Sequence, residues 1–206
     1  MTALLLAVTG CGTDAGAAVR PADAPAPTPS KAVDQTAKSA LAGLIVLPRG
    51  FIADPKNTTG PFSTETYLAN YSAEPALDRA LLLNSGFVEG YRATRLSPDK
   101  KQRYTIQLFK AATPAKAKVL QEGLWRQEPR THPFPVTGAL TNAHAAYDAG
   151  TEKTEATAEA SFLSGSLVAL LTIRESAPLG TTIRPNTTLI STLTPQQQSR
   201  LTTTSS

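Results

Sequence analysis

The stretch from residue 156 to residue 173 constrains the fold of this 206-residue chain more than any other part of the sequence. In its first half apolar residues alternate with polar ones, the apolar positions being Ala156, Ala158, Ala160 and Phe162. After the turn residues Ser164 and Gly165, an almost unbroken apolar run extends from Leu167 to Ile173. Alternation of period two predicts a strand with one buried face. An apolar run of this length predicts a strand covered on both faces, so the two halves together predict a β-hairpin.

A second pattern of period two lies earlier in the chain. Residues 87–96 and 103–110 flank the polar turn 97–102, and Tyr104, Ile106 and Leu108 alternate with Thr105 and Gln107. This pattern predicts another hairpin. Residues 143–147 predict a weaker strand between the two hairpins.

Helices are predicted in three places besides a short one after Ser63. The first begins near Pro75 and ends at Gly86, the second begins at Thr113 and Pro114, and the third covers the tail from about Asn186. Pro195 should either kink the tail helix or start a new turn. Because runs of strands are separated from runs of helices, we predict an α+β fold, with a mostly antiparallel sheet of two hairpins and helices packed against it.

The amino terminus carries a short uncharged apolar run, residues 3–8, followed by Thr9, Gly10 and Cys11. The run is too short to span a bilayer, which needs about 20 residues, and is typical of the end of a signal peptide. A signal peptide should open with basic residues, but no Lys or Arg precedes Arg20. We therefore expect the true reading frame to start upstream of Met1.

Residues 12–40 are rich in Ala, Pro and Thr and hold few large apolar residues. Such a composition cannot bury enough surface to offset the entropy lost on ordering, which predicts a disordered tether. We therefore divide the chain into a signal-peptide remnant (1–10), a linker that starts at Cys11 (11–40) and a single α+β domain (41–206).

The residues Val8-Thr9-Gly10-Cys11 resemble the bacterial lipobox. Together with the tether and the segments 86–91, 135–138 and 166–171, they make the chain resemble the uncharacterised lipoproteins of actinobacteria. The resemblance implies a diacylglyceryl group on Cys11, the plasma membrane as a partner and a domain on the outer face of that membrane. Two acyl chains anchor a protein stably where one does so only marginally. The alternative is that Cys11 is an ordinary free cysteine.

The scarcity of reactive side chains limits the chemistry. One Cys and two His exclude a disulfide framework and match no metal-site template, so we expect no metal and no cofactor. We expect a non-enzymatic envelope module, without catalytic residues, that binds an unknown ligand or protein in a groove between sheet and helices. The alternative is an envelope hydrolase with a non-standard site near His144, Asp148 and Ser164 or Ser166, although no GxSxG motif surrounds either serine.

Charge is distributed unevenly between the two predicted hairpins. The net charge is +4, with basic residues gathered from Arg92 to Lys118 and acidic ones from Asp148 to Glu159. We predict that Lys100, Lys101 and Arg103 surround an exposed turn that contacts anionic surfaces. The alternative is a solvated turn with no binding role. The expected compartment argues against a nucleic-acid partner.

Overall fold

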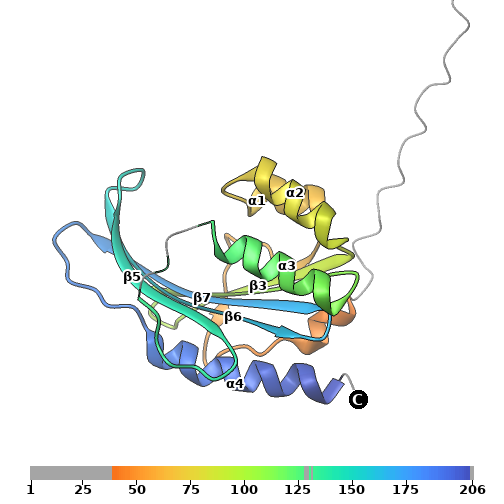
Figure 1. Cartoon of the computed structure of the whole chain (residues 1–206). Helices are drawn as coiled ribbons and strands as arrows, with labels where there is room; N and C mark the ends of the chain where they lie inside the picture. Colours follow the sequence, from red (N-terminus) through yellow and green to blue (C-terminus); the bar gives the residue numbers. More distant parts are fainter. Residues whose placement is uncertain (1–38, 128–129, 131, 205–206) are drawn as a thin grey trace, which may run out of the picture. The chain divides into compact units, whose positions relative to one another are not determined.

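A computed structural model describes residues 39–127, 130 and 132–204, so Cys11 and nearly all of the predicted tether lie outside the described residues. Within that part of the chain, one seven-stranded sheet forms the centre of the fold (Figure 1). Its strands are β1 (Ile52–Ala53), β2 (Gly60–Phe62), β3 (Glu89–Leu96), β4 (Gln102–Lys110), β5 (Leu140–Asp148), β6 (Lys153–Ser164) and β7 (Leu167–Pro178).

Every strand pair in this sheet is antiparallel. The order is β1-β3-β4-β7-β6-β5, and β2 also pairs with β3. The hairpins β3–β4 and β6–β7 match the two predicted from the period-two patterns. They join through the long-range pair β4–β7. The weak strand expected at 143–147 is longer than predicted, because all nine residues of β5 pair with β6.

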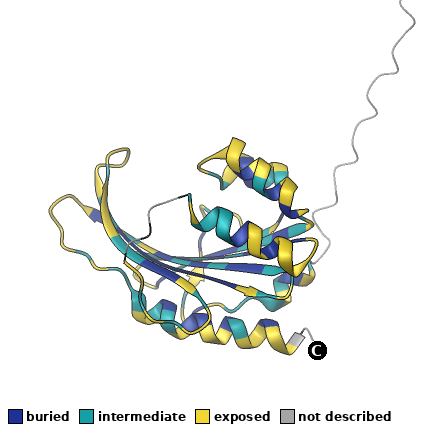
Figure 2. Cartoon of the chain, in the orientation of Figure 1, coloured by how far each residue is buried: buried dark blue, intermediate teal, exposed yellow. Residues whose placement is uncertain are grey.

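Helix α4 (Thr187–Thr204) and the short 3₁₀ helix η1 (Ala40–Leu44) cover one face of the sheet. The apolar sets of β4, β6 and β7 point to this face and pack against Ile190, Leu193 and Leu201 of α4. Buried residues accordingly follow the sheet in Figure 2. Helix α4 starts after Asn186, whose side chain accepts a hydrogen bond from Leu189 N, and continues through Pro195. Pro195 therefore lies inside the helix and does not start a new turn.

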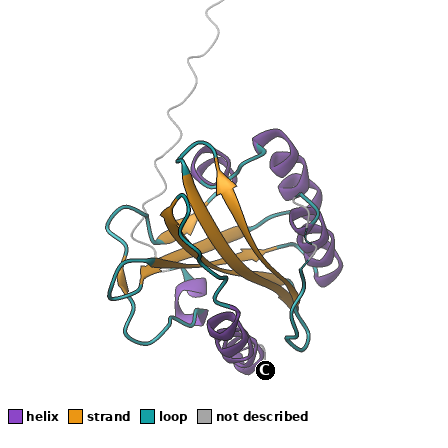
Figure 3. Cartoon of the chain, turned by 90° about the vertical axis from the view of Figure 1, so that its left-hand side faces the viewer, coloured by secondary structure: helices purple, strands orange, loops and turns teal. Residues whose placement is uncertain are grey.

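Helices α1 (Thr64–Asn70), α2 (Pro75–Ser85) and α3 (Pro114–Trp125) lie on the opposite side of the sheet from α4 (Figures 1 and 3). They enclose a second core, in which the Phe62 ring packs within 5.9 Å, centroid to centroid, of the rings of Tyr67, Tyr71, Phe87 and Phe109. The predicted α+β fold, an antiparallel sheet with helices packed against it, is confirmed.

Local sequence signals set the ends of these helices. Ser63 caps α1 by accepting a hydrogen bond from Thr66 N, and Thr113 caps α3 in the same way from Lys116 N. Helix α2 ends at Gly86, whose φ of 58° is readily adopted only by glycine. Both caps and the glycine stop agree with the sequence prediction.

Candidate functional site

Polar side chains occupy one end of the sheet face that carries α1, α2 and α3. Side chains alternate between the faces of a sheet, so residues paired across neighbouring strands share a face. Three rows of paired residues cross the strands on this face. The first row holds Arg92, Gln107 and Leu170, and the second holds Thr94, Thr105, Thr172 and Glu159. The third row holds Arg103, Arg174, Thr157 and His144.

All of these residues except the fully buried Thr94 line a groove of about 410 Å³ between the sheet and the helices. The helical wall adds Tyr67, Asn70, Tyr71 and Asp78, and Leu124 is one of its few apolar residues. The volume lies in the range of small-molecule sites, about 300–1,000 Å³, but such sites are usually mostly apolar. A groove lined by hydroxyl, amide and charged groups suits a polar ligand.

A buried ion pair closes one side of the groove. Arg130 Nε lies 2.9 Å from Glu159 Oε1, and the two side chains are only 10% and 7% exposed. Asn142 donates a further hydrogen bond to Glu159, and the Arg130 guanidinium stacks over the Trp125 ring at 4.1 Å. Because both charges are desolvated, removal of one partner would leave the other buried without compensation.

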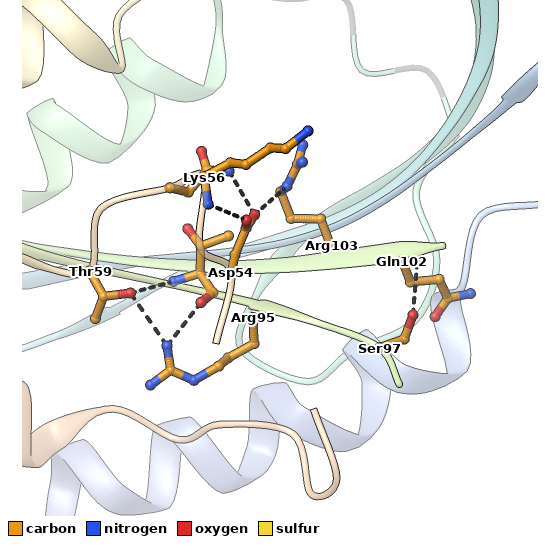
Figure 4. Close-up of polar contacts among 9 residues, drawn as sticks. Asp54, Lys56, Thr59, Arg95, Ser97, Gln102 and Arg103 are labelled. Atoms are coloured by element: carbon orange, nitrogen blue, oxygen red, sulfur yellow. Dashed lines mark hydrogen bonds and ion pairs between the residues drawn. The ribbon is translucent and has the colours of Figure 1, made fainter. Parts of the chain in front are cut away.

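Asp54 holds Arg103, a second charged residue of the groove lining (Figure 4). Its side chain is 1% exposed and accepts hydrogen bonds from Arg103 Nε, Lys56 N and Asn57 Nδ2, at 2.9, 2.9 and 2.6 Å. Burial by itself would raise the pKa of Asp54. The hydrogen bonds and the Arg103 charge outweigh burial and lower this pKa below its ordinary value.

Arg103 and Arg174 lie directly opposite each other on β4 and β7. Like charges in this position destabilise a sheet unless they are compensated. Each has a carboxylate of its own: Asp54 for Arg103, and Glu155 for Arg174 with an Nε to Oε2 distance of 3.5 Å. The acidic residues therefore hold two arginines in place at the edge of the groove.

Arg92 has no such carboxylate among the described residues. Its guanidinium stacks over the Tyr71 ring at 4.2 Å, while its Nε is buried and has no hydrogen-bond partner in the described part of the chain. Burial lowers the pKa of Arg92, and the positive charges of Arg103 and Arg174 lower it further.

The helical wall contributes one carboxyl group, that of Asp78, and the phenol group of Tyr67. Asp78 accepts hydrogen bonds from Ser72 Oγ and Gln127 Nε2, both at 2.5 Å. Burial raises the pKa of the Tyr67 hydroxyl, and the charge of Asp78 raises it further, so this group stays protonated at neutral pH. Tyr67 is therefore a neutral hydroxyl in the groove wall.

Of the three basic residues predicted to surround an exposed turn, two lie in the turn itself and Arg103 lies just after it, in β4. Lys100 and Lys101 are exposed in the β3–β4 turn, where Lys100 has a φ of 60°. Arg103 belongs to the groove, where it is paired with Asp54. Arg103 lines the groove because it already takes part in the alternation of β4, so its contact with anionic surfaces stays a prediction.

The residues of the hydrolase alternative are also far apart. His144 on β5 pairs with Thr157 on β6, whereas Ser164 and Ser166 lie at the β6–β7 turn. Ser164 is seven residues further along β6 than Thr157. This spacing corresponds to about 23 Å of extended strand. Asp148 accepts hydrogen bonds from Gly150 N and Thr151 Oγ1 in its own turn. No nucleophile–base pair forms among these residues, so the predicted hydrolase site is wrong.

Two further expectations from the sequence concern Cys11 and metal ions. Cys11 lies outside the described residues. Within residues 39–127, 130 and 132–204, no three His, Cys, Asp or Glu side chains gather as metal ligands do. No helix in the same ranges is both long enough and apolar enough to cross a bilayer.

The sequence interpretation did not place Arg92 in a groove and did not single out Arg174. Arg92 was counted only as part of a basic hairpin, and Arg174 follows the long apolar run of β7. A usable signal was present in β4, because Arg103, Thr105 and Gln107 all alternate with the core residues. That pattern indicates a polar sheet face, although it does not show that helices would turn this face into a groove.

Comparisons with known proteins add little. No protein-family model matches the chain, and no curated protein matches it. The extracellular domain of PknH from Mycobacterium tuberculosis is similar in structure, with a TM-score of 0.33 and 8% sequence identity over 73% of this chain and 78% of that chain. A similarity this weak carries no argument about function.

Proposed function

We propose that this chain is a lipid-anchored protein of the outer face of a bacterial plasma membrane, and that its α+β domain binds a ligand in the groove between the sheet and helices α1 to α3. The groove is the observation that carries the proposal. Its polar groups come from strands as well as helices. A recess of this size with converging polar side chains is a candidate binding site.

The chemistry of the lining supports binding in preference to catalysis. Hydroxyl and amide groups of Thr105, Thr157, Thr172 and Gln107 face the groove, and its charged groups are arginines and engaged carboxylates. Catalysis by a nucleophile needs an adjacent base within hydrogen-bond reach, and the predicted candidates His144 and Ser164 are seven residues apart along the paired strands β5 and β6. The arrangement suits recognition of a polar molecule.

The anchor rests on the lipobox-like residues around Cys11. Metabolic labelling with an alkynyl fatty acid tests it, in a bacterial host and with the gene carrying a complete signal peptide. We expect the wild-type chain to be labelled and Cys11→Ala to be unlabelled.

A matched control separates lipobox recognition from the mere presence of a thiol. Because Cys11 is the only cysteine of the sequence, the double variant Cys11→Ala/Ser206→Cys moves the thiol to the other end of the chain. This variant should also remain unlabelled. Equal labelling of Cys11→Ala and the wild type would refute the anchor.

Ligand binding in the groove is tested with the full chain carrying Cys11→Ala. A thermal-shift panel of sugars, sugar acids, amino acids and short peptides is applied to this protein and to Thr172→Trp, which places a large ring in the groove. A ligand at 100 times its dissociation constant stabilises its protein by about 2.7 kcal/mol. We expect that stabilisation to disappear in Thr172→Trp.

Thr188→Trp is the control, since Thr188 is exposed on α4, across the sheet from the groove. Its response should equal that of the parent protein. Ligands that stabilise Thr172→Trp as strongly as the parent bind elsewhere, and that result would contradict the proposed site.

A further inference from the structure

Arg92 is the least compensated charge in the groove. Its Nε and the hydroxyl of Thr94 are the two buried side-chain polar atoms that lack a hydrogen-bond partner in the described part of the chain. Both residues belong to β3, and their spacing of two puts them on the same face of the sheet. A buried polar group without a partner costs about 1–3 kcal/mol. Thr94 is fully buried and does not line the groove, whereas Arg92 does, so Arg92 is the group to which a ligand can supply the missing contact.

The other two arginines are oriented by their carboxylates. The ion pairs of Arg103 and Arg174 both use Nε, and these side chains are 43% and 51% exposed. Their terminal nitrogens therefore keep donor capacity beyond the ion pair, because a guanidinium carries five N–H groups. The three arginines line one groove, and the charges of Arg103 and Arg174 act on Arg92.

We infer that the groove recognises an oxyanion, a carboxylate or phosphate group on a polar ligand, through Arg92 with Arg103 and Arg174 beside it. The inference rests on the proposed function, because it names the ligand class of the same groove. A guanidinium matches both oxyanions with two parallel hydrogen bonds. Of the acidic lining residues, Glu159 is neutralised by its ion pair with Arg130. Asp78 is hydrogen-bonded by the neutral side chains of Ser72 and Gln127 and keeps its charge, so the three arginines outweigh a single negative charge.

The rest of the ligand should carry hydroxyl groups. Next to Arg92, the groove is lined by Asn57, Thr105, Gln107 and Thr172, which donate and accept hydrogen bonds without carrying charge. We therefore test the inference with three probes that share a sugar body: glucose 6-phosphate, glucuronate and glucose. The first two separate a phosphate from a carboxylate, and the third lacks the anion.

Calorimetric titration of the full chain carrying Cys11→Ala measures the three affinities. We expect at least one anionic probe to bind at least tenfold more tightly than glucose. Arg92→Gln should weaken that binding at least tenfold, and Arg92→Lys, which keeps the charge but loses the planar fork, should weaken it less. Arg95→Gln is the matched control, because Arg95 lies on the same strand but points to the other face, and should change the affinity less than twofold.

Thermal unfolding shows whether a loss of binding reflects a loss of folding. Arg92→Gln removes a half-buried guanidinium that has no carboxylate partner and is repelled by two like charges, so the melting temperature should stay equal or rise. A lower melting temperature with weakened binding would mean that Arg92 is structural, and would overturn the inference.

Other results overturn the inference without touching the proposed function. Glucose binding as tightly as glucose 6-phosphate, with both lost in Thr172→Trp, would retain the groove as a site but reject the oxyanion. Equal affinity of Arg92→Gln and the parent protein would reject it as well. So would the absence of binding by both anionic probes, while the groove itself is judged by the panel on Thr172→Trp.

Discussion

Replacing Gly90 by alanine should destabilise the fold, because the added methyl group meets the Phe62 ring. A Cβ at residue 90 would lie 2.1 Å from two carbons of that ring, where ordinary contact begins at 3.4 Å. The ring has little room to move, since it packs against Tyr67, Phe87 and Phe109 at centroid distances of 5.5, 5.9 and 5.3 Å. Overpacking of a core typically costs about 1–3 kcal/mol, and we expect the upper end of that range here.

A double-mutant cycle assigns the cost to the ring. Phe62→Ala alone should lower the free energy of unfolding by about 3–5 kcal/mol, since Phe62 is only 4% exposed. Once the ring is absent, Gly90→Ala should be neutral to within about 0.5 kcal/mol. The two changes should therefore couple by about 2–3 kcal/mol, which is large for a residue pair.

Urea unfolding of the four proteins measures the cycle, provided that the dependence of the free energy on urea stays constant. Gly43→Ala is the control, because no atom lies within 4 Å of a Cβ built there, and should change the free energy of unfolding by less than about 1 kcal/mol. If Gly90→Ala destabilises the wild type and the Phe62→Ala background equally, the clash with the ring is not the cause and the reasoning fails.

Two further predictions concern buried polar groups. Gln197 is fully buried, accepts a hydrogen bond from Val46 N and donates one to the carbonyl of Leu44. Gln197→Leu should therefore lower the free energy of unfolding by about 2–4 kcal/mol, whereas Gln198→Leu, which removes an exposed hydrogen bond, should lower it by less than about 0.5 kcal/mol. Similar urea midpoints for the two variants would contradict this prediction. Asp54→Asn should destabilise the fold at pH 7. Because the folded-state pKa of Asp54 is lowered, its contribution is present above the unfolded value of about 3.9 and is lost as the pH falls through the folded value, so the deficit of the variant should shrink at pH 3. An unchanged deficit at pH 3 would show that the ion pair with Arg103 is not the source.

The candidate site was only partly predictable from the sequence. A groove between sheet and helices was expected, and the polar alternation of β4 is visible in the sequence, but Arg103 was assigned to an exposed turn. The pairing of β4 with β7 placed Arg103 opposite Arg174, and the loop before β2 supplied Asp54. Neither contact leaves a trace in the local pattern, because the partners are distant in the chain.

The sequence by itself determined the elements whose signals are local. Side-chain alternation, the caps at Ser63 and Thr113 and the glycine stop at Gly86 act over a few residues, so they define the hairpins and helix ends wherever these lie in the fold. Only the tertiary structure decided which strands are neighbours and which polar groups are buried. Both depend on contacts between remote segments, such as the hydrogen bonds of Gln197 with the segment 44–46. The same kind of contact gives Arg103 a carboxylate partner, whereas Arg92 has none in the described part of the chain.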